Sequence, residues 1–210
     1  MGTRERRERE REEVRTMILD AARELFVAEG YEAVTMRKVA DRIEYSATAI
    51  YFHFKDKEAL LRQLCEADFL KLAAQFARIA KVKDPVERLR KTGHAYLDFA
   101  AEFPNHYRLM FMTPTPPIPL EEHTEIRHGN PEEDSYAFLR SIVDECLATG
   151  RFRKGLKDAE LISQTIWATV HGVAALQIAR GSDPWVEWRP MKKRVDAAIE
   201  MIIAGLTGGE

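Results

Sequence analysis

The sequence is poor in cysteine. Its 210 residues include 2 cysteines, Cys65 and Cys146, and each lies within an apolar helical pattern. Neither has the spacing of a zinc-ligand set, and a disulfide framework is not indicated. We expect both to be small buried residues of a protein that folds in a reducing compartment, which favours a cytoplasmic location.

Long apolar runs are also absent. No segment approaches the roughly 18 consecutive apolar residues that a membrane-spanning helix requires. Residues 2–15 are charged almost throughout, and no apolar run of signal-peptide type follows them. We therefore expect neither membrane insertion nor export.

The chain has no strong charge of either sign, since its formal net charge is -2 at pH 7. This balance argues against a protein that coats polyanions over its whole surface. It leaves open a local basic surface, which is what specific DNA binding requires. Such a local excess occurs within residues 35–57, which carry Arg37, Lys38, Arg42, Lys55 and Lys57.

Strand-like alternation of convincing length is missing, whereas apolar residues recur at helical spacing along the chain. We predict an all-α fold of about nine helices. The sequence also lacks a nucleophile elbow, a Gly-rich phosphate loop and a convincing set of metal ligands. An α-helical enzyme is therefore the unfavoured alternative, and no cofactor or metal is expected.

Residues 35–57 form the stretch with the clearest chemistry. Thr35 and Ser46 can each cap a short helix, and a tight turn separates the two helices. The second helix carries small side chains at Ala47, Thr48 and Ala49. Side chains that can donate hydrogen bonds follow at Tyr51, His53, Lys55 and Lys57. A helix-turn-helix whose second helix enters a DNA major groove needs this arrangement. The alternative is an ordinary helical hairpin with a solvated face.

The segment before this stretch predicts a first helix that starts near Val14 and ends at Gly30. Arg and Glu alternate along residues 4–13, where opposite charges can pair at helical spacing. This extension is either a frayed solvated helix or an arm whose arginines reach a minor groove.

Later helix starts are indicated by capping residues and prolines. Asp56 can cap a helix that begins at Lys57, and Asp84 with Pro85 can open the next. A short helix is expected at 107–112. Further helix starts are expected at Pro131, at Asp158 and at Pro190.

Residues 113–130 contain four prolines and are expected to form a long loop. The second half of the loop carries Glu121, Glu122, His123, Glu125 and His128. A solvated loop explains these residues, and a metal site is the alternative.

The order of helix, helix-turn-helix and a turn of the form Tyr-x-His-Phe-x-x-Lys resembles the TetR family of bacterial transcriptional repressors. The resemblance covers roughly residues 14–62, the family's DNA-binding domain. It rests on Gly30-Tyr31, Thr35, Arg37, Val39-Ala40, Ser46, Ile50-Tyr51, His53-Phe54 and Lys57-Glu58-Ala59-Leu60.

A second match lies nearer the C-terminus. Trp167, His171 and Gly172 look like the Trp-x-x-x-His-Gly signature of one TetR subgroup, the subgroup with a WHG-type C-terminal domain. Trp167 and His171 share one helix face, and Gly172 would permit another helix to approach closely. The pair is either a core Trp stacked on a core His or part of an effector pocket.

The resemblance implies an N-terminal three-helix DNA-binding domain at 1–56 and an effector-binding and dimerisation domain at 57–210. It implies a regulator that a small molecule releases from a palindromic operator. The last two long helices would form the homodimer surface, unless their apolar faces are buried within the monomer. A helical DNA-binding protein without an effector is the alternative function.

The resemblance also assigns roles to residues. Contacts to phosphates would come from Thr35, Tyr51, His53 and Lys57, with Arg37 or Lys38. Base edges would face Ser46, Ala47, Thr48 and Ala49. An apolar or aromatic effector would meet Phe99, Phe103, Tyr107, Met110, Phe111, Trp167 and His171.

The turn departs from the family pattern at one position. Glu44 stands where the family usually has Gly. A non-Gly residue in a left-handed turn costs about 1 kcal/mol. We therefore expect either a differently built turn or a first short helix that continues through this position.

Overall fold

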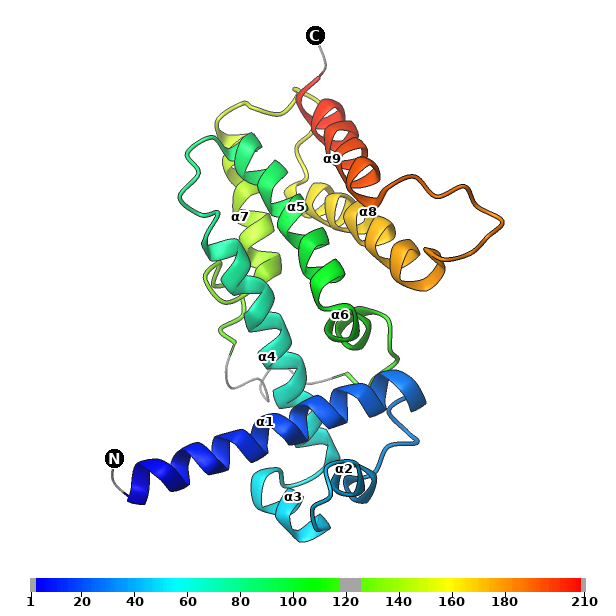
Figure 1. Cartoon of the computed structure of the whole chain (residues 1–210). Coiled ribbons are helices and arrows are strands. Elements are labelled where there is room, and N and C mark those ends of the chain that lie inside the picture. Colours follow the sequence, from blue (N-terminus) through cyan, green and yellow to red (C-terminus); the bar gives the residue numbers. More distant parts are fainter. Residues whose placement is uncertain (1–2, 118–125, 209–210) are drawn as a thin grey trace. The chain divides into compact units, whose positions relative to one another are not determined.

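The computed structural model describes residues 3–117 and 126–208, and within these ranges helices are the only regular secondary structure (Figure 1). This confirms the predicted all-α fold. The helices are α1 Thr3–Glu29, α2 Met36–Arg42, α3 Ala47–His53, α4 Lys57–Ala77, α5 Pro85–Glu102, α6 Pro104–Phe111, α7 Ser135–Ala148, α8 Ala159–Arg180 and α9 Met191–Thr207.

The chain divides into two compact units. Unit 1 comprises Met1–Asp68 and Asn105–Glu125, and unit 2 comprises Phe69–Pro104 and Ile126–Glu210. Helix α4 begins in unit 1 and ends in unit 2. The expected domain boundary at residues 56 and 57 remains a prediction.

The core of unit 1 is built from α1 to α4 and one residue of α6. Helix α1 contributes Ile18 and Phe26, and α3 contributes Ile50, all with no exposed surface. Further buried members of the core are Val34, Val39, Ala40, Phe54, Leu60, Leu61, Leu64 and Leu109. The apolar spacing in the sequence therefore predicts the packed face of each of these short helices.

Side-chain caps begin the helices of unit 1 where the sequence indicates. The Thr35 hydroxyl accepts the backbone N–H of Lys38 at 3.2 Å, and the Ser46 hydroxyl accepts that of Ala49 at 3.2 Å. Asp56 accepts the N–H of Ala59 at 2.7 Å at the start of α4. The three predicted caps are confirmed.

Helix α1 is longer than the apolar pattern alone indicates. It runs without interruption from Thr3, so the charged extension continues the helix that Val14 was expected to open. Arg4 pairs with Glu8 and Arg6 pairs with Glu10, both at 3.1 Å. These pairs explain why an extension with no apolar face is helical.

A buried ion pair joins three helices of unit 1. The Arg23 guanidinium of α1 donates two hydrogen bonds to Asp68 of α4, from Nε at 3.1 Å and from Nη2 at 2.8 Å. His106 Nδ1 of α6 lies 2.7 Å from Asp68 Oδ1. Because Asp68 and Arg23 are both buried, the pair fixes the register of α1 on α4.

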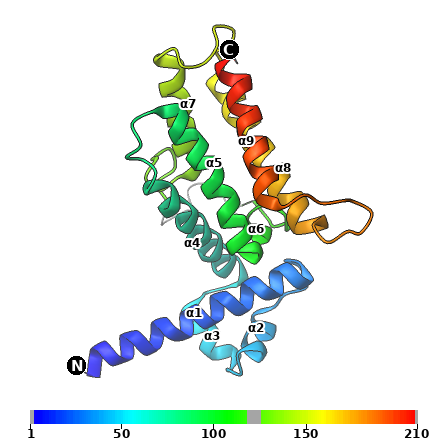
Figure 2. The same ribbon diagram turned by 45° about the horizontal axis from the view of Figure 1, so that its top comes forward.

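Helix α5 lies at the centre of unit 2 and packs against α7, α8 and α9 (Figure 2). Gly93 permits the contact with α9, since a Cβ at this position would lie 3.1 Å from Ile199 Cδ1. The rings of Phe76 and Phe138 stack with their centroids 5.5 Å apart. Side chains of α4, α5, α7, α8 and α9 thus supply most of the buried residues of unit 2, and the segments between helices add Ile126 and Phe152.

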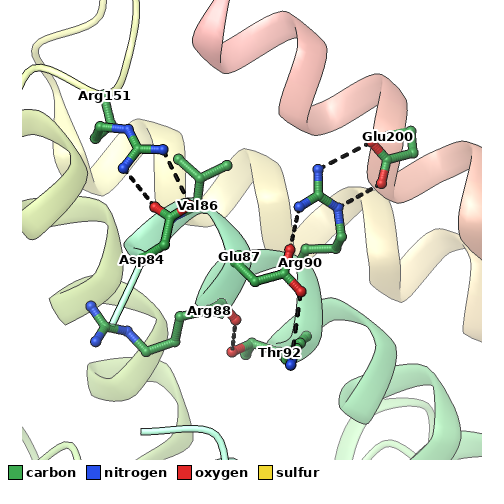
Figure 3. A network of polar contacts seen from close by, with 9 residues as sticks. Asp84, Val86, Glu87, Arg88, Arg90, Thr92, Arg151 and Glu200 are labelled. Atoms are coloured by element: carbon green, nitrogen blue, oxygen red, sulfur yellow. Dashed lines mark hydrogen bonds and ion pairs between the residues drawn. The ribbon is translucent and has the colours of Figure 1, made fainter. Parts of the chain in front are cut away.

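Ion pairs join the outer surface of α5 to its neighbours (Figure 3). Arg90 Nε donates to Glu200 of α9 at 2.7 Å. Arg151 Nη1 lies 2.6 Å from Asp84, the residue that caps α5. Arg88 pairs with Glu145 of α7. These contacts fix the first two turns of α5 against three other segments of the chain.

The predicted helix start at Pro131 is wrong. Helix α7 begins four residues later, where Asp134 accepts the backbone N–H groups of Tyr136 at 2.9 Å and Ala137 at 3.1 Å. Before it, the N–H of Asp134 bonds to the carbonyl of Asn130 at 2.8 Å and closes a turn. A side-chain cap thus sets the helix start, and Pro131 lies within the turn.

Two sequence expectations concern membranes and metals. None of the helices described is long and apolar enough to cross a membrane. Across residues 3–117 and 126–208, no group of three or more His, Cys, Asp or Glu residues is arranged to hold a metal ion. Most of the proposed loop ligands, Glu121, Glu122, His123 and Glu125, lie outside the described residues.

The buried pair predicts a large effect on stability. Asp68→Ala should lower the free energy of unfolding by roughly 3–5 kcal/mol, because it leaves the Arg23 guanidinium buried without its bidentate partner. Urea denaturation followed by circular dichroism measures the change. Glu8→Ala, which breaks an exposed pair, is the control and should leave the curve nearly unchanged. Equal curves for the two variants would contradict the structural role of Asp68.

Candidate nucleic-acid interface

Helices α2 and α3 form a helix-turn-helix with one anchored face. Ile50 and Phe54 bury the inner side of α3 in the core of unit 1. On its other side Ser46, Thr48 and Tyr51 are exposed and Ala49 is half-buried, whereas Ala47 is half-buried and packs against the core. The sequence-predicted base-facing residues therefore lie on a short helix that is fixed from behind and carries small side chains.

The turn between α2 and α3 differs from both sequence expectations. Helix α2 ends at Arg42, and Glu44 adopts the left-handed conformation with φ 59°. The N–H of Tyr45 bonds to the carbonyl of Ala40 at 3.0 Å, and the N–H of Glu44 to that of Asp41 at 3.4 Å. This is a Schellman motif, which usually has Gly at the left-handed position. The turn thus has the usual geometry and carries the strain of a non-Gly residue.

The hydroxyl groups of Thr35 and Ser46, which cap α2 and α3, can each still donate a hydrogen bond. Thr35 and Ser46 each use the oxygen to accept a backbone N–H, and both side chains are exposed. A hydroxyl that accepts one bond can still donate its own hydrogen. Each residue can therefore cap its helix and donate to a phosphate oxygen at once.

The nearby cations differ in how they are held. Lys38 Nζ lies 2.6 Å from Glu29, and Lys57 Nζ donates to the carbonyl of Tyr31 at 2.9 Å while it lies 4.0 Å from the Tyr31 ring centre. Arg37 is exposed on α2. Lys57 thus links the start of α4 to the end of α1, and a phosphate would bind it through its other N–H groups.

His53 is half-buried at the end of α3, and its Nδ1 atom is buried without a hydrogen-bond partner. Burial lowers the pKa of His53, and the neighbouring charges of Arg11 and Arg15 lower it further. The imidazole is therefore neutral at pH 7, so any phosphate contact that it makes would be a neutral hydrogen bond.

The sequence reasoning missed Phe52, whose side chain is 71% exposed at the end of α3. The guanidinium of Arg11 lies 5.2 Å from the centre of its ring, and Arg15 lies 5.6 Å from that of Phe54. Phe52 is the variable position of the Tyr-x-His-Phe motif, between Tyr51 and His53, and this aromatic residue was the only sign of its role in the sequence. Contacts with α1 could not be derived from it.

A polar cluster in unit 2 surrounds the second sequence match. Trp167 Nε1 donates to the Tyr96 hydroxyl at 3.0 Å, and His171 Nδ1 lies 3.3 Å from the same oxygen. The Tyr96 hydrogen can be donated to Nδ1, which places the His171 proton on Nε2. Burial lowers the pKa of His171, which favours this neutral form. Tyr96 was missed because it lies on another helix, far away in sequence.

Trp167 is not a core residue of the described chain, since its side chain is 38% exposed. Its ring lies edge-on to that of His171 at 6.5 Å. No helix of the described chain approaches Gly172, since a Cβ there would meet nothing within 4 Å, and the expected approach of another helix stays a prediction.

The other expected effector residues form two aromatic pairs. Phe99 and Phe103 lie in unit 2 with ring centroids 5.4 Å apart. Tyr107 and Phe111 lie in unit 1 with centroids 4.9 Å apart, and Met110 of the same helix is half-buried. An effector site that includes all seven residues remains a prediction.

An anchored helix-turn-helix whose second helix exposes Thr48 and Tyr51 is the arrangement of a helix-turn-helix regulatory protein. Residues 18–64 match the family model of bacterial regulatory proteins of the tetR family, and residues 89–204 match the tetracyclin repressor-like C-terminal domain. The chain belongs to the TetR family. The resemblance stated from the sequence is confirmed, and the family consists of regulators of transcription and not of enzymes.

Among known proteins, the chain is similar to the HTH-type transcriptional activator FasR of Mycolicibacterium smegmatis, with 33% identity over 102 residues, or 48% of this chain and 47% of FasR. It is 37% identical over 76 residues to the HTH-type transcriptional repressor AcnR of Corynebacterium diphtheriae, covering 36% of this chain and 38% of AcnR. The chain thus spans less than half the length of these curated relatives.

The fold is shared with solved structures over nearly the whole chain. One is the transcriptional regulator FadR of Bacillus subtilis in complex with stearoyl-CoA, which has a TM-score of 0.73 and 19% sequence identity. The similarity covers 90% of this chain and 98% of that chain. The likeness confirms the helical architecture.

The strained turn yields a prediction about stability. Glu44→Gly should raise the free energy of unfolding by about 0.5–1 kcal/mol, because Gly adopts positive φ without the Cβ clash. Glu44→Ala is the matched control and should give no such gain, since Ala meets the same clash. Thermal denaturation of the three proteins measures the difference. If Ala stabilises as much as Gly, the charge of Glu44 and not its backbone conformation is the cause.

Proposed function

We propose that the protein is a ligand-responsive, DNA-binding transcriptional regulator that represses genes from a palindromic operator. The observation that supports this best is α3, which Ile50 and Phe54 anchor from behind while Thr48 and Tyr51 are exposed. The phosphate contacts would come from Thr35, Arg37, Lys38, Tyr51, His53 and Lys57. The base edges would meet Ser46, Ala47, Thr48 and Ala49.

Base reading by this helix is sparse. Ala side chains can contact thymine methyl groups, and Ser46 and Thr48 can each make single hydrogen bonds. The bidentate readers of guanine and adenine, Arg, Asn and Gln, do not occur in α3, whose sequence is ATAIYFH. Sequence-dependent DNA shape would then supply part of the specificity.

A dimer would bring two such units to the two halves of a palindrome. One unit makes few contacts, so tight binding needs two at fixed separation. Large apolar side chains are exposed on α8 at Leu161 and Leu176 and on α9 at Met201. Gly172 also lies on α8, and a Cβ at this position would meet no atom of this chain within 4 Å. These features support a homodimer through α8 and α9.

Release from DNA would follow from a small molecule that binds the two states of the protein with different affinity. Within unit 2, the Phe99–Phe103 pair and the cluster of Tyr96, Trp167 and His171 suit a ligand with an apolar body and a hydrogen-bonding group. FadR, which shares the fold, was solved with stearoyl-CoA, and this is compatible with such a ligand.

Repression is favoured because AcnR is a repressor and the C-terminal family model is repressor-like. FasR is an activator, so activation is the alternative outcome of the same DNA binding. A cytoplasmic protein without enzymatic activity fits this role. A DNA-binding protein without an effector is the alternative function.

Two substitutions in α3 separate phosphate contacts from base contacts. Tyr51→Ala should weaken binding to all sequences alike, because phosphate contacts carry no sequence information. Thr48→Ala should change the preferred sequence at the bases it faces. Selection of binding sites from random duplexes measures both, with Thr149→Ala, at an exposed position after α7, as control. An unchanged consensus with Thr48→Ala would contradict the base-facing role of α3.

The effector site is tested by ligand-induced thermal shifts. A straight-chain acyl-CoA at a concentration about 100 times its dissociation constant should raise the free energy of unfolding by about 2.7 kcal/mol. The melting temperature should then rise by roughly 5–10 °C. His171→Ala and Phe111→Ala should each lose most of this shift, while the exposed Trp185→Ala should keep it. Retention of the full shift by both site variants would contradict this placement.

A further inference from the structure

An arginine stripe runs along the first half of α1. At 3.6 residues per turn, Arg4, Arg7, Arg11 and Arg15 fall within an arc of roughly 80° on one side of the helix. Arg4, Arg7 and Arg11 are exposed, and Arg15 is half-buried. Arg6 and Arg9 lie on the opposite side of α1, among glutamates.

The inner end of the stripe is fixed to the DNA-reading helix. Arg11 lies over the ring of Phe52 and Arg15 over that of Phe54, the two aromatic residues at the end of α3. Arg15 Nη2 also donates to Gln63 Oε1 of α4 at 2.7 Å. The N-terminal end of α1 continues past α3 within the same unit (Figures 1 and 2).

We infer that this stripe is a second DNA-contacting element, in which Arg4, Arg7 and Arg11 bind backbone phosphates that flank those bound by α2 and α3. The inference rests on the proposed function. Arginine suits the role because its planar guanidinium can donate two parallel hydrogen bonds to one phosphate. The contacts with Phe52 and Phe54 turn the inner end of the stripe toward the end of α3, the helix that is proposed to enter the major groove.

The same geometry favours phosphate contacts over a minor-groove arm. The extension is a continuous helix in the described chain, and a helix with side chains is about 10–12 Å wide. The minor groove of B-DNA is about 6 Å wide, so a docked helix meets phosphates and not the groove floor.

The pairing of Arg4 with Glu8 does not remove its capacity to bind DNA. Both side chains of that pair are largely exposed, and exposed pairs contribute little to stability. A phosphate can therefore replace the carboxylate as the partner of Arg4. The field of the stripe already reaches α3, where Arg11 and Arg15 contribute to the lowered pKa of His53.

Two double variants with the same change of charge test the inference. Arg4→Gln with Arg7→Gln removes two residues of the stripe, and Arg6→Gln with Arg9→Gln removes two from the opposite side. Fluorescence anisotropy measures the affinity of each full-length protein for a duplex selected from random sequence, between 50 and 200 mM KCl. Circular dichroism of both variants verifies that α1 remains helical.

The stripe variant should bind several-fold more weakly at the lowest salt. Its slope of log K against log salt should become shallower by nearly 2 for each protomer that binds the duplex, because each phosphate that is no longer neutralised reduces the slope by about 0.9. The opposite-side variant should match the wild type. Equal effects of both variants, or none, would overturn the inference while leaving operator binding by α3 intact. A wild type that selects no duplex would overturn both.

Discussion

The helix-turn-helix unit depends on one buried interaction, the bidentate pair of Arg23 and Asp68. Removing two charges from water costs free energy, and this cost is offset only when the two groups pair with each other. The pair therefore favours the one register of α1 on α4 in which Arg23 meets Asp68. His106 adds a third helix to the same carboxylate. The position of α3 follows from this frame, because Ile50 and Phe54 pack into the core that α1 and α4 define.

Within that frame, much of the positive charge near α3 is already bound. Lys38 meets Glu29, Arg42 meets Glu24, and Lys57 meets the carbonyl of Tyr31. The proposed phosphate contacts would draw on hydroxyl groups, on Arg37 and on the arginines of α1, and also on Lys38 and Arg42, because a phosphate can replace the carboxylate of an exposed pair. A small-residue α3 with such anchors favours recognition by phosphate geometry and DNA shape over dense base contacts.

Local chemistry made much of the fold predictable. Cap residues such as Thr35, Ser46 and Asp158 bond to backbone groups two or three residues away, so their roles can be inferred from neighbouring residues. Pro131 misled because a competing cap at Asp134 lay close by. Glu44 misled because the turn keeps its geometry at an energetic cost, and sequence reasoning assumed that such a cost would be avoided.

Contacts between distant residues were not predictable. Arg23 and Asp68 lie on different helices, as do Tyr96 and Trp167. No periodicity in the sequence pairs them. The same limit applies to the candidate site, where the motif located α3 and its donors but could not show that Phe52 and Phe54 receive Arg11 and Arg15.

The central claim is that the exposed face of α3 recognises a palindrome. Hydroxyl-radical footprinting of the full-length protein, on a duplex selected from random sequence, tests it most directly. The account predicts two symmetrically protected half-sites whose centres lie about one helical turn, 10–10.5 base pairs, or a multiple of it apart. Uniform protection along the duplex, with no preferred sequence, would contradict it.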